Sequence, residues 1–195
     1  NADRFVVASG VGAAPGQVPM NNNMVDPWIV SRSENQFLKY VAGNGFQLIT
    51  AGTTPANYLT SAGGAISGAT LPLNNGTEIL NLATANATLG INADIYALRL
   101  DRDINSSTDN AFRRIIIRSG GLMQVANTPT INPDLYFGAA GDGTGEALIW
   151  ANNNTLQING KIFASQVVKS GTAFLNIRSD QSNITGNWII NGGGL

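Results

Sequence analysis

The stretch from Val168 to Leu195 reads VKSGTAFLNI (168–177), RSDQSNI (178–184) and TGNWIINGGGL (185–195). Short apolar runs alternate here with Gly, Asn and Ser, the residues that favour turns. The runs follow one another too closely for helices, but their length suits β-strands. The stretch therefore predicts closely spaced strands joined by tight turns.

The same pattern of short apolar runs separated by turn residues continues through most of the chain. In residues 96–100 and 155–158 every second residue is apolar, as expected when one face of a strand packs inward and the other meets water. No segment of helical periodicity separates the strand-like runs. These runs are 26–30, 36–40, 45–50, 77–82, 94–100, 113–118, 121–125, 135–137, 147–150, 155–158, 161–163 and 166–168.

Two architectures accommodate such short strands. An ordinary parallel sheet needs crossover helices, whereas a parallel β-helix returns the chain through its own other faces. An antiparallel sandwich also has short strands, but hairpin-type dipeptides such as Asn159-Gly160 are few, which weakens that alternative. The strand pattern alone leaves both architectures open.

Residues 168–195 resemble the autotransporter-associated β-strand repeat of bacterial surface proteins, which has the form K-x-G-x-G-x-L-x-L, N-x-x-x-G and I-x-x-G-x-L. Ala173 stands where that pattern has its second Gly, and the turn reads SNITG at 182–186. Residues 26–50 loosely resemble a block that precedes such repeats. The resemblance implies a right-handed parallel β-helix.

We therefore expect an all-β fold in which residues 1–195 form a single β-solenoid segment, with 51–75 as a loop excursion. That range is rich in Ala, Gly, Thr and Ser and contains Pro55 and Pro72. Coils of about 20–25 residues at a spacing of about 4.8 Å predict about eight rungs and a length of about 40 Å. Asn at the turns should stack in ladders between coils. Both ends fall inside the pattern, so we expect a fragment of a longer chain.

Composition restricts the function classes. The net charge is −1 and charged residues are 12% of the chain, which offers no field to attract nucleic acid. No run of about 18 apolar residues is present, so we expect no membrane-spanning segment. Cys and His are both absent, which excludes disulfides, Ser-His-Asp and Cys-His nucleophile systems, and nearly all zinc sites.

Two acidic motifs were considered as sites. Asp101 and Asp103 would share a face of an extended segment and could serve as calcium ligands or an acid/base pair, but a solvated strand end near Arg99 and Arg102 is the favoured interpretation. The sequence GDGTGE at 141–146 is similar to Gly-rich calcium-binding repeats, which work as tandem copies; as a single copy it predicts a β-turn.

Basic and aromatic residues give two further hypotheses. Arg113, Arg114 and Arg118 could form a patch for an anionic polysaccharide, but they are better interpreted as residues that keep the triplet 115–117 from aggregating. A carbohydrate-stacking strip would need aligned aromatic rings, whereas core or rung-end packing is the favoured role of the tryptophans. The residues considered for the strip are Trp28, Trp150, Trp188, Tyr40, Tyr58, Tyr96 and Tyr136.

We therefore expect a non-catalytic structural segment of a large exported bacterial cell-surface protein: a stalk, fibre or adhesin shaft, located extracellularly or on the cell surface. We assign no catalytic residue, cofactor or metal site. The expected partners are neighbouring repeats or copies of the chain at the solenoid ends, with surface polysaccharide as a further candidate. The alternative is a β-helix protein that binds carbohydrate or cleaves polysaccharide.

Overall fold

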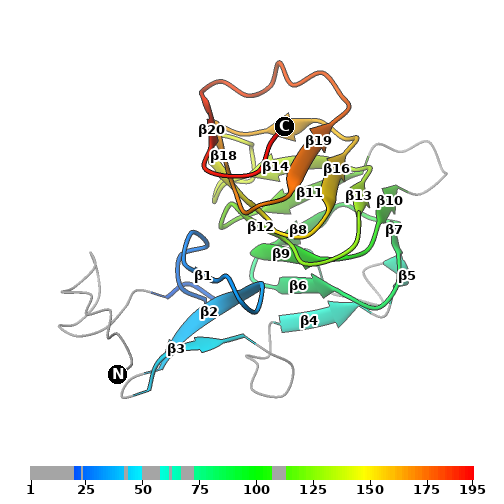
Figure 1. The fold of residues 1–195 in the computed structure, drawn as a ribbon. Coiled ribbons are helices and arrows are strands. Elements are labelled where there is room, and N and C mark those ends of the chain that lie inside the picture. Colours follow the sequence, from blue (N-terminus) through cyan, green and yellow to red (C-terminus); the bar gives the residue numbers. More distant parts are fainter. Residues whose placement is uncertain are drawn as a thin grey trace.

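The structure is a computed structural model and describes residues 20–22, 24–41, 44–49, 58–61, 63–66, 73–106 and 113–195. These residues are all-β and contain no helix, and accordingly none that is long and apolar enough to cross a membrane. Seventeen strands, β4 to β20, wind into a solenoid of about six turns, and three more form a small antiparallel sheet beside it (Figure 1).

The solenoid has three parallel sheets, each of which takes about one strand from every coil. The seven-stranded sheet comprises β4 (Tyr58–Ser61), β6 (Ile79–Leu82), β9 (Ala97–Leu100), β12 (Gly121–Gln124), β15 (Glu146–Ala151), β18 (Gln166–Ser170) and β20 (Trp188–Ile190). The six-stranded sheet comprises β5 (Gly64–Ile66), β7 (Ala87–Leu89), β10 (Ile104–Ser106), β13 (Thr130–Ile131), β16 (Thr155–Ile158) and β19 (Phe174–Ile177). The four-stranded sheet comprises β8 (Ala93–Ile95), β11 (Arg114–Ile117), β14 (Asp134–Phe137) and β17 (Ile162–Phe163).

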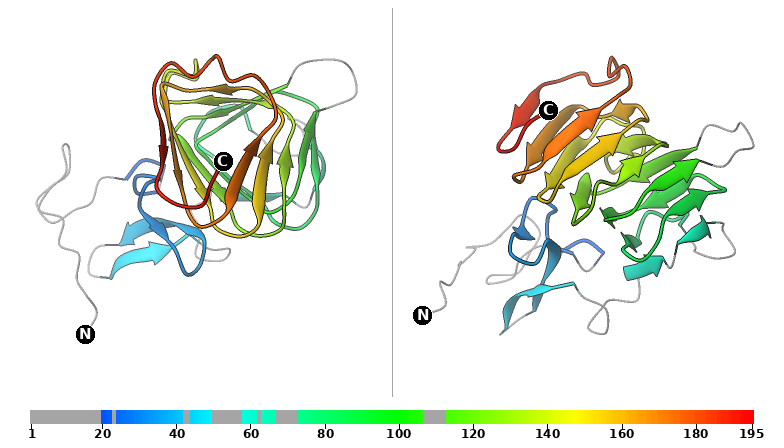
Figure 2. Two further views of the ribbon diagram at one scale, coloured as in Figure 1. Left: turned by 45° about the horizontal axis from the view of Figure 1, so that its top comes forward. Right: turned by 45° about the vertical axis from the view of Figure 1, so that its right-hand side comes forward.

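The parallel β-helix is therefore confirmed and the sandwich is excluded for these strands. Figure 2 shows strands of successive coils lying over one another around a common axis. Coil length varies along the solenoid. Leu80 pairs with Leu98, 18 residues later, whereas Leu122 pairs with Ile149, 27 residues later. Asn159-Gly160 is not a hairpin turn: it is a corner between β16 and β17, which belong to different sheets.

The core follows from the alternation of inward and outward residues along each strand. One inward column of the seven-stranded sheet runs through Leu80, Leu98, Leu122 and Ile149, all at most 1% exposed. Polar side chains form ladders at the corners, as predicted. Asn132 donates to Asn105 (2.8 Å) and Asn159 donates to Asn132 (2.7 Å), so each coil satisfies an amide group of the next.

Two polar residues break the apolar inward columns. Gln124 is fully buried, and its side-chain amide donates to the carbonyls of Ala126 (3.1 Å) and Asn127 (3.0 Å). Lys169 follows Ile149 in the inward column and is also fully buried, with Nζ donating to the carbonyls of Gly171 and Gly192. Both side chains thus hold corners of the coil together from inside the core.

The solenoid is shorter than expected, for an identifiable reason. The described residues of the range 20–49 do not form coils: β1 (Val30–Ser31) and β3 (Gly45–Leu48) each pair antiparallel with β2 (Gln36–Val41). Six steps of about 4.8 Å give about 29 Å, where eight rungs and 40 Å were predicted. The single-solenoid description of residues 1–195 is therefore corrected: the strands of the solenoid begin at Tyr58.

The range 51–75 also differs from the expected excursion. Its described part contains β4 and β5, which pair in parallel with β6 and β7 and so belong to the first coil. Asn74 forms a further parallel bridge with Asp94. These two strands are short, with four residues in β4 and three in β5. The small residues of this range are compatible with strands of that length. The other residues of 51–75 lie outside the described part of the chain.

The antiparallel sheet packs on the outer face of the seven-stranded sheet (Figures 1 and 2). The contact is an apolar cluster of Met24, Phe37, Ile49, Tyr58, Ile79, Tyr96, Ala97 and Met123. Asn35, in the turn before β2, adds polar contacts: its backbone carbonyl accepts from Arg99 Nε (3.0 Å), and its Oδ1 accepts from Asn152 Nδ2 (3.0 Å).

Gly121 is a point of close approach between the two parts. A Cβ atom at this position would lie 2.5 Å from Pro27 Cβ and 3.3 Å from Phe37 Cε1. We expect Gly121→Val to weaken the docking of the antiparallel sheet by about 1–3 kcal/mol, the usual range for overpacking. Hydrogen exchange should then be faster for the amides of β2 and β3 and unchanged for those of β14. Equal acceleration in all three strands would contradict this role of Gly121.

Candidate functional site: the seam between the antiparallel sheet and the solenoid

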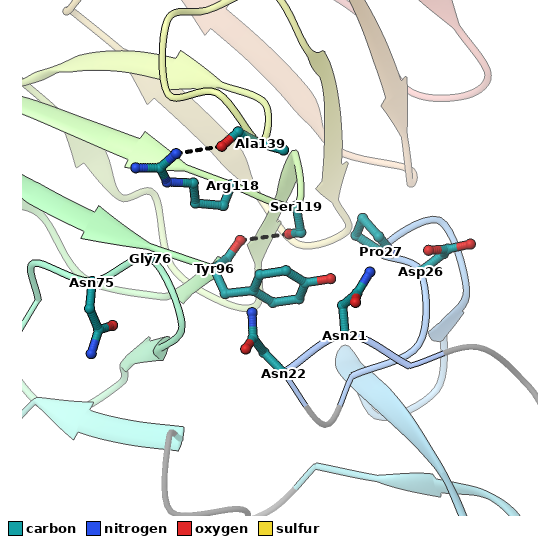
Figure 3. Close-up of a pocket in the computed structure, with 10 residues that line it drawn as sticks. All are labelled: Asn21, Asn22, Asp26, Pro27, Asn75, Gly76, Tyr96, Arg118, Ser119 and Ala139. Atoms are coloured by element: carbon teal, nitrogen blue, oxygen red, sulfur yellow. Dashed lines mark hydrogen bonds between the residues drawn. The ribbon is translucent and has the colours of Figure 1, made fainter. Parts of the chain in front are cut away.

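A polar cleft of about 670 Å³ lies along the seam (Figure 3). One wall is the segment before β1 and the other is the edge of the solenoid where β8 leads into β9 and β11 leads into β12. The residues that line it are Asn21, Asn22, Asp26, Pro27, Asn75, Gly76, Tyr96, Arg118, Ser119 and Ala139. The cleft is thus rich in amide, hydroxyl and charged groups.

Arg118 provides the positive charge of the cleft but is fully engaged. Its Nε and Nη2 donate to the two carboxylate oxygens of Asp94 at 2.8 and 2.6 Å, and its Nη1 donates to the Ala139 carbonyl. The hydrogen bond with Asp94 raises the pKa of Arg118 further above its ordinary value. A bidentate pair of this kind leaves no free charge for an anionic ligand.

Tyr96 lies at the centre of the cleft, with its phenol directed toward Asn21 (Figure 3). Its backbone carbonyl accepts from the Ser119 hydroxyl at 2.6 Å. Burial raises the pKa of the Tyr96 phenol, and the negative charge of Asp26 raises it further, so the phenol is neutral near pH 7. The Tyr96 hydroxyl is therefore a neutral hydrogen-bonding group of the cleft. Within the described ranges, no group of three or more Asp or Glu residues could hold a metal ion.

The acidic pair considered in the sequence is used by the solenoid itself. Asp103 accepts from the Thr130 backbone N–H (2.8 Å) and from Asn86 Nδ2 (3.1 Å), which joins three successive coils. Asp101 lies 3.4 Å from Arg102 Nη1, and burial raises the pKa of its carboxyl despite that neighbour. Neither Asp101 nor Asp103 lines the polar cleft.

Residues 141–145 form a turn-like connection, as predicted, and Glu146 already begins β15. Asp142 Oδ1 accepts from the backbone N–H of Thr144 (3.0 Å) and from its hydroxyl (2.7 Å). These hydrogen bonds lower the pKa of Asp142. Gly141 and Gly143 have positive φ angles of 74° and 81°, the conformation that glycine adopts most readily.

The three arginines do not form one patch. Arg118 pairs with Asp94 in the polar cleft, whereas the guanidinium of Arg114 lies over the ring of Tyr136, 5.3 Å from its centroid. Tyr136 in turn stacks on Phe163 with a centroid distance of 4.1 Å. Because the ring faces contact one another, this outward ladder stabilises neighbouring coils and leaves little ring surface for a ligand.

The three tryptophans occupy three different environments. Trp188 follows the inward residue Val167 and packs against the solenoid core, so rung-end packing is confirmed for it. Trp150 points outward and its indole N–H donates to Asn35 Oδ1 at 3.4 Å. Trp28 is 67% exposed, which contradicts core packing for this residue. The alternation of inward and outward residues along β15 is a sequence signal that could have predicted the outward position of Trp150. No sequence signal could have predicted that Trp28 lines a cleft together with Trp150.

The chain has no match among protein-family models, curated proteins or solved structures.

Proposed function

We propose that this chain is a non-catalytic structural segment of a large exported bacterial cell-surface protein, acting as a stalk, fibre or adhesin shaft. The observation that carries the proposal is the stack of about six coils whose core is continuous from the first coil to the last. Each added coil makes such a stack longer and contributes a stabilising interface with its neighbour, which suits a shaft.

The ends of the stack support the same proposal. In the described sheets, β4 and β20 are edge strands and have a neighbour on one side only. Apolar side chains are exposed near β20: Phe174 is 59% exposed, and Ile189 and Ile190 are each 39% exposed. Open parallel edges with apolar flanks recruit further strands. We therefore propose neighbouring repeats of the same polypeptide, or further copies of this chain, as the partners.

The extracellular or cell-surface location is part of this proposal and has a direct test. Antibodies against residues 113–195 should label intact cells of the source organism, and the labelling should disappear after brief protease treatment of those cells. Labelling only after the cells have been lysed would contradict an exported shaft. A cytoplasmic marker protein in the same sample shows whether the cells are intact.

The polysaccharide-cleaving alternative has less support. It needs carboxylates that converge on one groove, and Asp101 and Asp103 instead hold coil corners or pair with arginine.

A further inference from the structure

A second, smaller cleft lies on the seam, with a volume of about 220 Å³. It lies where the antiparallel sheet ends and the outer face of the seven-stranded sheet continues along β15, β18 and β20. The residues that line it are Pro27, Trp28, Val30, Leu148, Ile149, Trp150, Val168, Ser170 and Asn191.

The floor of this cleft is an apolar column on the outside of the solenoid. The register pairs Leu148 with Val168 and Val168 with Ile189, so these side chains lie in line on one face. The same column is covered by the antiparallel sheet at Gly121, one coil earlier, where Pro27 and Phe37 approach. Beyond that point the column becomes gradually more exposed: Leu148 and Val168 are half-buried, and Ile189 is 39% exposed.

Two indole rings border the floor. Trp150 is half-buried, and its N–H is directed toward Asn35 in the turn before β2. Trp28, from the segment before β1, is 67% exposed. Together with the column, this exposed indole forms an apolar surface patch of the kind that marks binding grooves.

The remaining lining groups are polar and neutral. Ser170 contributes a hydroxyl and Asn191 an amide, both of which donate and accept hydrogen bonds. None of the described residues that line the cleft carries a charge. A charged ligand would therefore lose hydration here without gaining a partner of opposite charge.

We propose that this cleft binds one ring of a neutral glycan, with Trp28 and Trp150 as the aromatic platforms. The C–H bonds on the face of a sugar ring carry partial positive charge and suit the negative face of an indole. Ring hydroxyls donate and accept, as Ser170 and Asn191 do. The volume is below the range of about 300–1,000 Å³ typical of larger ligands and suits a single ring.

A peptide fits this cleft less well. The backbones of β15 and β18 are hydrogen-bonded to strands on both sides, so a peptide on this face could not add to the sheet. The polar cleft beside Tyr96 is also less suited to glycan stacking, because Tyr96 is only 9% exposed. The glycan site is independent of the proposed shaft function, since a single copy of the chain contains all of it.

The test is a titration of the whole chain with cellohexaose, xylohexaose, mannohexaose and chitohexaose, followed by intrinsic tryptophan fluorescence, with polygalacturonate as the anionic probe. We expect saturable binding of at least one neutral hexaose and none of polygalacturonate. Trp28→Ala should weaken that binding about tenfold or more, as truncation of a central aromatic contact does. Phe174→Ala is the matched control, because it removes another exposed aromatic residue from a different sheet and should leave binding unchanged.

Melting temperatures of both variants show that they fold. No saturable binding of any neutral hexaose at millimolar concentration would overturn the proposal, as would equal binding by the wild type and Trp28→Ala. A concentration-dependent dimer that Trp28→Ala dissociates, without glycan binding, would instead assign this face to a second copy of the chain.

Discussion

Gly171→Ala is expected to lower the free energy of unfolding of the solenoid by about 2–5 kcal/mol. Gly171 has a φ of 86°, which costs an alanine about 1–2 kcal/mol. A Cβ atom there would also lie 2.2 Å from the carbonyl oxygen of Ala151 in the preceding coil. Overpacking against backbone adds about 1–3 kcal/mol because the backbone cannot rotate away as a side chain can. Urea unfolding followed by circular dichroism measures the change.

Gly64→Ala is the control for this prediction. Gly64 also has a positive φ, 78°, but a Cβ atom there would meet nothing within 4 Å. Only the conformational cost should remain, about 1–2 kcal/mol. If the two substitutions have equal effects, the close approach of coils at Gly171 does not contribute to stability.

Lys169→Ala is expected to cost about 2–5 kcal/mol, the range for truncating a large buried side chain. Lys169 Nζ donates to the carbonyls of Gly171 (2.9 Å), Gly192 (2.7 Å) and Ser170 (3.3 Å), so it joins two successive coils. Alanine leaves both a cavity and these carbonyls without their donor. Lys169→Met fills the volume and avoids burying a charge, so its cost should be smaller, about 1–3 kcal/mol. If Lys169→Ala and Lys169→Met lower the free energy of unfolding equally, the cavity left by alanine does not contribute to the cost.

The pH dependence of the unfolding free energy, compared between the wild type and Lys169→Met, tests the burial of the Lys169 ammonium group. Burial lowers the pKa of Lys169 below its ordinary value of 10.5. Between the lowered pKa and 10.5 the unfolded chain binds more protons than the folded chain, so this group's contribution to stability rises with pH. The difference in unfolding free energy between the wild type and Lys169→Met should therefore move in favour of the wild type as the pH approaches 10.5. A difference that is constant up to that pH would show that Lys169 is not desolvated.

The coil architecture could be predicted from the sequence because alternation and turn residues are local signals. Residues 155–158 alternate as predicted, with Leu156 and Ile158 inward, and the Asn ladders lie at the corners. The K-x-G motif at residues 169–171 also has a structural role. Lys169 Nζ donates to the carbonyl of Gly171, and Gly171 forms the corner of the coil. Alternation along β18 alone would have placed Lys169 inward with Val167.

The antiparallel sheet and the clefts could not be predicted in the same way. The sequence predicts strands at 36–40 and 45–50, but a strand pattern does not say whether its partner is parallel or antiparallel. The docking brings Pro27 and Phe37 close to Gly121, which follows them by 94 and 84 residues in the sequence. Trp28 and Trp150 line the same cleft only because of that docking, so no local pattern could place them together.

Electron microscopy and light scattering over a range of protein concentrations test the shaft function most directly. We expect end-to-end rods or filaments that lengthen with concentration. Ile190→Lys should suppress them, because Ile190 belongs to the inward column and a charge there opposes a further coil. Ile189→Lys is the matched control, since Ile189 is equally exposed at 39% but points outward, and filaments should persist. Discrete monomers at every concentration, with a solenoid about 29 Å long, would contradict assembly through the coil edges.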